Sequence, residues 1–124
     1  MTTRILIVDD HPAIRRSVRG VLEAVPGFAV CGEAENGQIA IHKAPQLKPD
    51  VIVLDISMPV MNGLDAAKIL KSLMPQVPIL MFTSFTGANI SEEALAAGAS
   101  IVTSKSSPPD VLVHDLRTLV PNAA

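Results

Sequence analysis

Short apolar runs alternate along the chain with longer stretches in which apolar residues recur at helical spacing. The apolar runs predict strands at residues 4–9, 28–33, 51–55, 77–83 and 100–104. Most of these runs are continuously apolar rather than alternating, which is typical of parallel strands covered by helices on both faces. The pattern therefore predicts an α/β fold in which five strands alternate with five helices.

The stretch between the first two runs predicts a helix with one apolar and one basic side. We expect Arg15, Arg16 and Arg19 to face solvent on the basic side. The apolar side is made of Ile14, Val18, Val21, Leu22 and Val25.

Caps and prolines predict where the other helices begin and end. Asn36 is expected to cap the second helix, and Pro45 and Pro49 are expected to end it. Glycine and proline residues also set the limits of the last three helices. These helices are predicted at residues 63–74, 89–98 and 109–120.

Composition narrows the class of protein. With 124 residues, 48% hydrophobic content and a net charge of −2, the chain fits one folded domain. An aromatic content of 2% disfavours stacking sites for nucleic-acid bases or flavins. We therefore expect residues 1–124 to form one domain that binds no nucleic acid by itself and includes no DNA-binding domain.

The cellular location follows from cysteine use and from the absence of long apolar runs. The single cysteine, Cys31, lies in an apolar run and is expected to be a plain core residue, so a disulfide framework is excluded. No run of about 18 apolar residues is present, and acidic residues follow the amino terminus too early for a signal peptide. We expect a cytoplasmic protein without a membrane partner.

Polar and charged residues follow the apolar runs. The carboxyl ends of parallel strands form the ligand-binding edge of such a sheet. Two like charges ~4 Å apart repel by roughly 4 kcal/mol at an effective dielectric of about 20, so clustered carboxylates need a counter-cation. Because oxygen ligands select hard ions, Mg²⁺ is the expected cofactor. The residues at this edge are Asp9, Asp10, Asp55, Thr83 and Lys105.

A cation beside an aspartate, a lysine and a hydroxyl is suited to receive a phosphoryl group. Asp55 would attack the phosphorus, while Lys105 and the ion would neutralise the phosphoryl oxygens and Thr83 would bind one of them. No P-loop or glycine-rich phosphate loop is present, so no nucleotide cofactor is expected. The donor would be another phosphoprotein.

Four segments carry a resemblance to a known family: "ILIVDDHPAIRRSV", "GEAENGQIAIHKA", "KPDVIVLDISMPVMNGLDAAK", and "AAGAS" followed by the lysine at 105. They resemble the receiver domains of bacterial two-component response regulators over essentially the whole chain, and most of all the LuxR/NarL-type branch. The resemblance implies a flavodoxin-like sheet in the order 2-1-3-4-5 with helices on both faces. It also implies transcription regulation through a DNA-binding domain absent from this chain.

Carried over by position, the resemblance gives each site residue a role. Asp55 would be the phosphoacceptor, and Thr83 and Lys105 would match the switch hydroxyl and the phosphate-pairing lysine. The metal ligands would be Asp10 and Asp55 through their side chains, Ser57 through its carbonyl, and Asp9 through a water molecule.

One position departs from the family pattern. Three residues before the lysine, where the family usually has a tyrosine or phenylalanine that swings inward, this chain has Val102, and Ile101 replaces the usual glycine before it. Valine gains little by changing rotamer, so the aromatic part of the switch is expected to be missing. Phosphorylation would then be intact while its readout is weaker or different.

The leading prediction is a signalling domain that takes a phosphoryl group from a histidine kinase or phosphotransfer protein onto Asp55 and switches an output surface. Such self-catalysed chemistry does not make it a conventional enzyme. One alternative is an interaction module of the same fold with constitutive output. A Mg²⁺-dependent phosphohydrolase is a third, disfavoured because "ISMP" follows Asp55 where a second aspartate would act as acid and base.

The fifth predicted helix has more apolar residues than one core stripe needs. Such a surplus indicates either broad burial against the sheet or an interface. With the first helix it is the candidate surface for a homodimer, and the arginines are candidates for contact with an acidic kinase partner. Of the histidines, His42 and His114 are expected at the surface, and His11 is expected to start a helix rather than bind the metal.

Overall fold

The structure, a computed structural model, describes residues 2–84 and 89–120. Strands and helices alternate throughout this part of the chain, and their limits differ from the predicted ones by a few residues. The strands are β1 (Thr3–Val8), β2 (Phe28–Ala34), β3 (Val51–Leu54), β4 (Ile79–Thr83) and β5 (Ile101–Ser104). The helices are α1 (Pro12–Glu23), α2 (Gly37–Leu47), α3 (Gly63–Leu73), α4 (Ile90–Ala96) and α5 (Pro109–Leu119).

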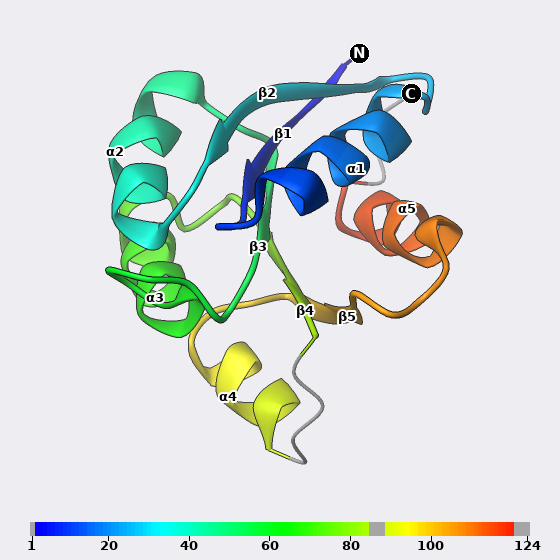
Figure 1. Cartoon of the computed structure of the whole chain (residues 1–124). Helices are drawn as coiled ribbons and strands as arrows, with labels where there is room; N and C mark the ends of the chain where they lie inside the picture. Colours follow the sequence, from blue (N-terminus) through cyan, green and yellow to red (C-terminus); the bar gives the residue numbers. More distant parts are fainter. Residues whose placement is uncertain (1, 85–88, 121–124) are drawn as a thin grey trace.

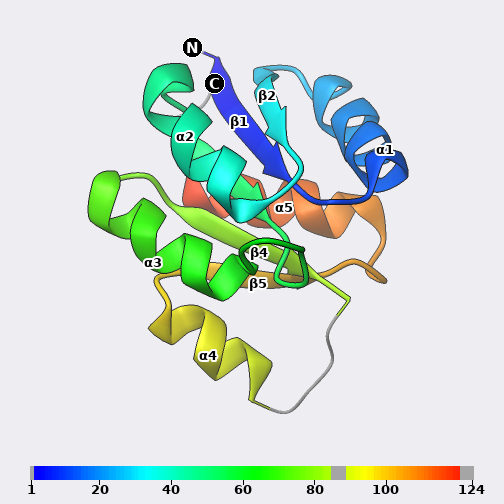
Figure 2. The same cartoon turned by 60° about the vertical axis from the view of Figure 1, so that its left-hand side comes forward.

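The strands form one parallel sheet in the order β2-β1-β3-β4-β5, which confirms the predicted topology. In Figure 1, α1 and α5 lie together on one face of the sheet, and α2 and α3 lie on the other. Figure 2 shows α4 beside α3, on the same side of the sheet. The fold is therefore a three-layer α/β/α arrangement. Within the described residues, no helix has both the length and the apolar content needed to cross a membrane.

Continuously apolar strands bury both faces of the sheet. Ile5 and Ile7 of β1 pack in a cluster with residues of α1 and α5, whereas Leu6 and Val8 pack in a second cluster with residues of α2, α3 and α4. All four side chains are at most 1% exposed. Each such burial contributes about 1.5–3 kcal/mol, so β1 is held firmly from both sides.

Burial accounts for the apolar surplus of α5. Leu112 and Leu116 are buried against the sheet, and Val113 and Leu119 pack at the edge of the same cluster. A homodimer through α1 and α5 stays a prediction.

Asparagine caps begin two helices. Asn36 caps α2 as predicted, because its Oδ1 accepts a hydrogen bond from the backbone N–H of Ile39 at 2.9 Å. Asn62 caps α3 in the same way, with its Oδ1 accepting from the N–H of Asp65 at 2.9 Å. The second cap directs the chain from the loop after β3 into its helix.

The prediction that Pro45 ends α2 is wrong. The helix continues through Leu47 with Pro45 inside it. The side chain of Leu47 packs so closely on Gly32 of β2 that a Cβ at Gly32 would lie 2.6 Å from it. Lys48 then ends the helix in the left-handed region, with φ 52°, and its N–H donates to the carbonyl of Ala44. This tertiary contact and this cap offset the local cost of proline.

The pairing of β1 with β2 contains a bulge at Cys31. The register passes from Ile5 opposite Val30 to Leu6 opposite Gly32, so Cys31 is the extra residue. Cys31 is half-buried, and burial raises the pKa of its thiol. The prediction of a plain core cysteine is therefore corrected to a partly exposed bulge residue.

Candidate functional site

The carboxyl ends of β1 and β3 place two aspartates side by side. The backbone N–H of Asp9 donates to the carbonyl of Ala34 at 3.0 Å, and that of Asp55 donates to the carbonyl of Val8 at 2.9 Å. These bonds continue the sheet ladder for one residue beyond each strand. Both aspartates are nearly inaccessible, with exposures of 2% for Asp9 and 3% for Asp55.

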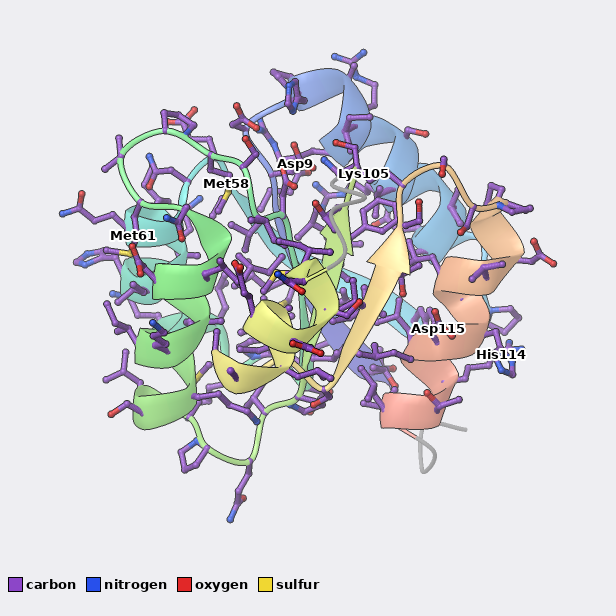
Figure 3. All side chains as sticks on the ribbon, turned by 90° about the horizontal axis from the view of Figure 1, so that it is seen from below. Asp9, Met58, Met61, Lys105, His114 and Asp115 are labelled. Atoms are coloured by element: carbon purple, nitrogen blue, oxygen red, sulfur yellow. The ribbon has the colours of Figure 1, made fainter. Side chains whose placement is uncertain are left out.

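Lys105 joins these two carboxylates. Its Nζ lies 2.6 Å from Oδ2 of Asp9 and 3.2 Å from Oδ2 of Asp55. The lysine follows β5, and its backbone N–H donates to the carbonyl of Thr83 at 2.9 Å, which fixes its position at this edge. Figure 3 shows Asp9 and Lys105 close together at this end of the sheet. One buried ammonium thus partly compensates two buried carboxylates.

The charge of Asp55 is unfavourable in this environment. Burial raises the pKa of its carboxyl group, and the negative charge of Asp9 raises it further. The ammonium of Lys105 and hydrogen bonds act in the opposite direction without reversing the shift. A further positive charge near Asp55 would therefore be stabilising.

Asp10 and His11 complete the cluster. Oδ1 of Asp9 accepts a hydrogen bond from the backbone N–H of His11 at 2.9 Å. Nδ1 of His11 lies 3.1 Å from Oδ1 of Asp9 and 3.0 Å from Oδ1 of Asp10. Asp9, Asp10, His11 and Asp55 each offer a ligand atom, and these atoms lie within 4.8 Å of one another.

The cluster fits a divalent cation. Oδ1 of Asp10 is buried, yet it accepts no hydrogen bond from residues in the described ranges. A buried carboxylate oxygen without a donor is costly unless a cation binds it. Three carboxylates beside one ammonium also leave a net negative charge. Hard divalent ions such as Mg²⁺ prefer this oxygen-rich donor set.

The loop between β3 and α3 is shaped by a close backbone approach. The N–H of Gly63 donates to the carbonyl of Ile56 at 2.7 Å. A Cβ at Gly63 would lie 2.0 Å from the carbonyl oxygen of Asp55, so only glycine fits there. Val60 in this loop has φ 70° and is 75% exposed, which is a strained conformation for a β-branched residue. The loop that follows Asp55 is thus set by backbone contacts.

The other predicted site residues lie at or near this edge. Thr83 is the last residue of β4, is 1% exposed, and pairs with Ser104 of β5. Ser57 lies in the exposed part of the loop after Asp55. The structure therefore brings together Asp9, Asp10, Asp55 and Lys105 by direct contact or close approach, and places Thr83 and Ser57 on the neighbouring backbone.

Val102 occupies the position in β5 at which the resemblance leads one to expect an aromatic residue. Val102 lies opposite Met81, is half-buried, and packs against the apolar cluster that Leu6 and Val8 form with residues of α2, α3 and α4. Its neighbour Thr103 points to the other face, where its Oγ1 donates to Oδ2 of Asp115 in α5 at 2.7 Å. Figure 3 shows Asp115 on the inner side of α5 and His114 directed away from the molecule. This link between β5 and α5 was not predicted from the sequence.

Two arginines of α1, Arg15 and Arg19, form ion pairs, whereas Arg16 is exposed as predicted. Nε of Arg15 donates to Oε1 of Glu33 at 3.0 Å, and its guanidinium also donates to the carbonyl of Asp9 at 2.6 Å. Arg19 also pairs with Glu33. The prediction of solvent-facing arginines is therefore wrong for Arg15, whose side chain is 17% exposed. The acidic residue Glu33, near the end of β2, could have indicated this ion-pair network in the sequence.

Comparisons with known proteins agree with this fold. The family described as "Response regulator receiver domain" matches residues 5–117. A protein-glutamate methylesterase/protein-glutamine glutaminase of Idiomarina loihiensis is 49% identical over 102 residues, covering 81% of this chain and 26% of that protein. The transcriptional regulatory protein LnrK of Bacillus subtilis is 36% identical over 116 residues, covering 94% of this chain and 53% of that protein. The crystal structure of a LuxR-family two-component response regulator from Aurantimonas sp. has a TM-score of 0.93 and 34% identity, covering 98% of this chain and 87% of that chain.

The matched region contains the whole carboxylate cluster and Lys105. The chain spans about a quarter of the methylesterase relative and about half of LnrK. The similarity therefore establishes the family of this domain. The chain belongs to the response regulator receiver domain family.

Proposed function

We propose that Asp55 accepts a phosphoryl group from a phosphohistidine of a histidine kinase or phosphotransfer protein. The observation that carries this proposal is the position of Lys105, whose Nζ lies 3.2 Å from Oδ2 of Asp55 and 2.6 Å from Oδ2 of Asp9. A positive charge therefore stands where the oxygens of a phosphoryl group on Asp55 would gather. Membership of the receiver family supports the same role.

In the proposed transfer, one oxygen of the Asp55 carboxylate attacks phosphorus. A P–O bond forms while the P–N bond to the donor imidazole breaks, and the imidazole nitrogen keeps the electron pair and takes a proton from solvent. Lys105 neutralises negative charge on the peripheral oxygens. Thr83, at the end of the adjacent strand, would donate its hydroxyl to one of these oxygens and couple phosphorylation to β4.

Mg²⁺ is the proposed cofactor. Asp10 and Asp55 would hold it through their carboxylates, Ser57 through its carbonyl, and Asp9 through a water molecule. The buried Oδ1 of Asp10, which accepts no hydrogen bond from the described residues, supports this assignment. When bound, the ion supplies positive charge that compensates the carboxylates and the phosphoryl oxygens. The chain would act on itself and would not turn over a separate substrate, so we do not propose a conventional enzyme.

The proposed output is transcription regulation through a DNA-binding domain in the same polypeptide. Two similar proteins that cover nearly all of this chain support it: the LuxR-family regulator and LnrK. The second candidate output is control of a methylesterase domain, supported by the higher identity of 49% to the Idiomarina protein, although over 81% of this chain. The full-length polypeptide distinguishes these outputs, because phosphorylation would change DNA binding in one case and ester hydrolysis in the other.

Val102 favours an output that does not use an aromatic switch. Val102 already packs against the apolar cluster of α2, α3 and α4. Phosphorylation would therefore move this region less than it would in a receiver domain with an aromatic ring that swings inward. In the limiting case, the output surface would contact its partner whether or not Asp55 is phosphorylated. Partner affinity measured with and without phosphate on Asp55 separates a weakened switch from a constitutive module.

The phosphoacceptor proposal is tested by the intact mass of the chain after addition of Mg²⁺ and a small acyl-phosphate donor. We expect one added phosphoryl group, which is absent in Asp55→Asn and absent when Mg²⁺ is chelated. Asp65→Asn is the matched control, because Asp65 is exposed in the first turn of α3. No adduct on the wild-type chain, even with a competent histidine kinase, would overturn the proposal.

A further inference from the structure

The side chain of His11 does not serve the helix that it begins. Its backbone carbonyl accepts the first helical hydrogen bond, from the N–H of Arg15 at 3.0 Å. Its side chain makes no capping hydrogen bond, although it occupies the cap position of α1. The expected role of His11 as a helix-start residue therefore accounts for its backbone, whereas its imidazole lies within hydrogen-bond distance of Asp9 and makes no contact with the helix end.

The imidazole instead faces the carboxylate cluster. Nδ1 of His11 lies 3.0 Å from Oδ1 of Asp10 and 3.1 Å from Oδ1 of Asp9. Two ligand atoms at neighbouring positions around an octahedral ion, each about 2.1 Å from the metal, are about 3.0 Å apart. The separation of Nδ1 from Oδ1 of Asp10 therefore matches that of neighbouring ligands of one ion, whereas Oδ1 of Asp9 lies within hydrogen-bond distance of the imidazole and would hold the ion through water.

Two further observations support a shared ligand set. Oδ1 of Asp10 is buried and accepts no hydrogen bond from the described residues, so it is available to a cation. The ligand atoms of His11 and Asp55 also belong to the group whose atoms lie within 4.8 Å of one another, so a cation whose opposite ligands are about 4.2 Å apart would have to draw them slightly closer. The side chain of His11 is 62% exposed, so the imidazole stands at the open rim of the cluster.

We propose that His11 supplies an imidazole ligand to this cation site, so that the site discriminates in favour of divalent transition ions that bind nitrogen. The inference rests on the cation site of the proposed function and concerns which ions that site holds. Mg²⁺ prefers oxygen ligands, whereas Ni²⁺ and Zn²⁺ gain affinity from imidazole. His11 is then a residue that determines metal specificity, while the carboxylates bind either ion.

Isothermal titration calorimetry of the tag-free chain with Mg²⁺ and, separately, with Ni²⁺ tests the inference at one fixed pH. The informative variant is His11→Asn, because asparagine is a good cap residue and keeps the start of α1 intact. His114→Asn is the matched control, since His114 is an exposed histidine on α5. We expect His11→Asn to lower the ratio of Ni²⁺ to Mg²⁺ affinity at least about tenfold, and His114→Asn to leave it unchanged.

The outcomes separate this inference from the proposed function. An unchanged affinity ratio in His11→Asn, with Mg²⁺-dependent phosphorylation of Asp55 intact, would overturn the role of His11 alone. An equal loss of affinity for both ions would also overturn it, because His11 would then act on the carboxylates and not as a nitrogen ligand. A wild-type chain that binds no Mg²⁺ and accepts no phosphoryl group would overturn the proposed function itself.

Discussion

Nζ of Lys105 lies 2.6 Å from Oδ2 of Asp9, although 96 positions separate the two residues in the chain. The contact exists because the carboxyl ends of β1 and β5 lie at the same edge of the parallel sheet. It places a buried ammonium between the carboxylate of Asp9 and that of Asp55, with the lysine side chain 13% exposed. The ammonium is the main positive charge that the described residues direct at Asp55, the proposed phosphoacceptor.

Replacing this ammonium should destabilise the fold. Lys105→Met leaves two buried carboxylates uncompensated, and we expect a loss of about 3 kcal/mol in the free energy of unfolding at pH 7. Millimolar Mg²⁺ should recover part of that loss, because a bound cation compensates the same carboxylates. Urea denaturation with and without a chelator measures both effects. Lys68→Met, at an exposed position of α3, is the control, and an equal loss in both variants would contradict the prediction.

Neutralising Asp55 should stabilise the metal-free chain. Burial and the charge of Asp9 raise the pKa of the Asp55 carboxyl group, so folding favours the protonated form. The stability that this form contributes is lost as pH rises from the ordinary aspartate pKa, about 4, through the raised pKa. Asp55→Asn should therefore unfold at a higher urea concentration than wild type at pH 7. The difference should shrink towards acidic pH and be reduced by Mg²⁺, which stabilises the ionised wild type. A metal-free Asp55→Asn chain less stable than wild type at pH 7 would contradict this account.

Two glycines should respond in opposite directions to alanine. At Gly63 a Cβ would lie 2.0 Å from the carbonyl oxygen of Asp55, so Gly63→Ala must displace the loop and should cost more than about 2 kcal/mol. At Gly20, inside α1, a Cβ would meet nothing within 4 Å, so Gly20→Ala should gain about 0.5–1 kcal/mol. Thermal denaturation measures both changes. The rate of phosphorylation should fall in Gly63→Ala and be unchanged in Gly20→Ala.

The link between β5 and α5 should also be measurable. Thr103 is 2% exposed and its hydroxyl donates to Asp115. Thr103→Val removes the donor and should cost about 1–2 kcal/mol, because the carboxylate loses its partner. Hydrogen exchange of α5 should become faster. Thr118→Val is the control, since its hydroxyl donates to the carbonyl of Asp115 at an exposed position, and similar effects of both changes would argue against a special link.

The fold and the centre of the site could be predicted from the sequence because both follow from strand order. Continuously apolar runs indicate buried parallel strands, and residues that follow such runs meet at one edge. Asp9, Asp55 and Lys105 were found in this way, and the structure brings them into contact.

Features that depend on tertiary contacts could not be predicted. Pro45 carries a local signal to end a helix, but the packing of Leu47 on Gly32 offsets it. Cys31 becomes a bulge residue because of strand register, which no local pattern encodes. The direction of the His11 imidazole depends on its side-chain torsions, which its sequence neighbours leave open.

The position of the phosphoryl group in the chain can be determined by chemical reduction followed by mass spectrometry. After reaction with Mg²⁺ and a small acyl phosphate, reduction with borohydride converts an aspartyl phosphate into homoserine, which peptide mass spectrometry assigns to one position. We predict homoserine at position 55 in the wild-type chain and at no position in Asp55→Asn. Homoserine at another aspartate, or none in a chain that binds Mg²⁺, would contradict the assignment of Asp55 as phosphoacceptor.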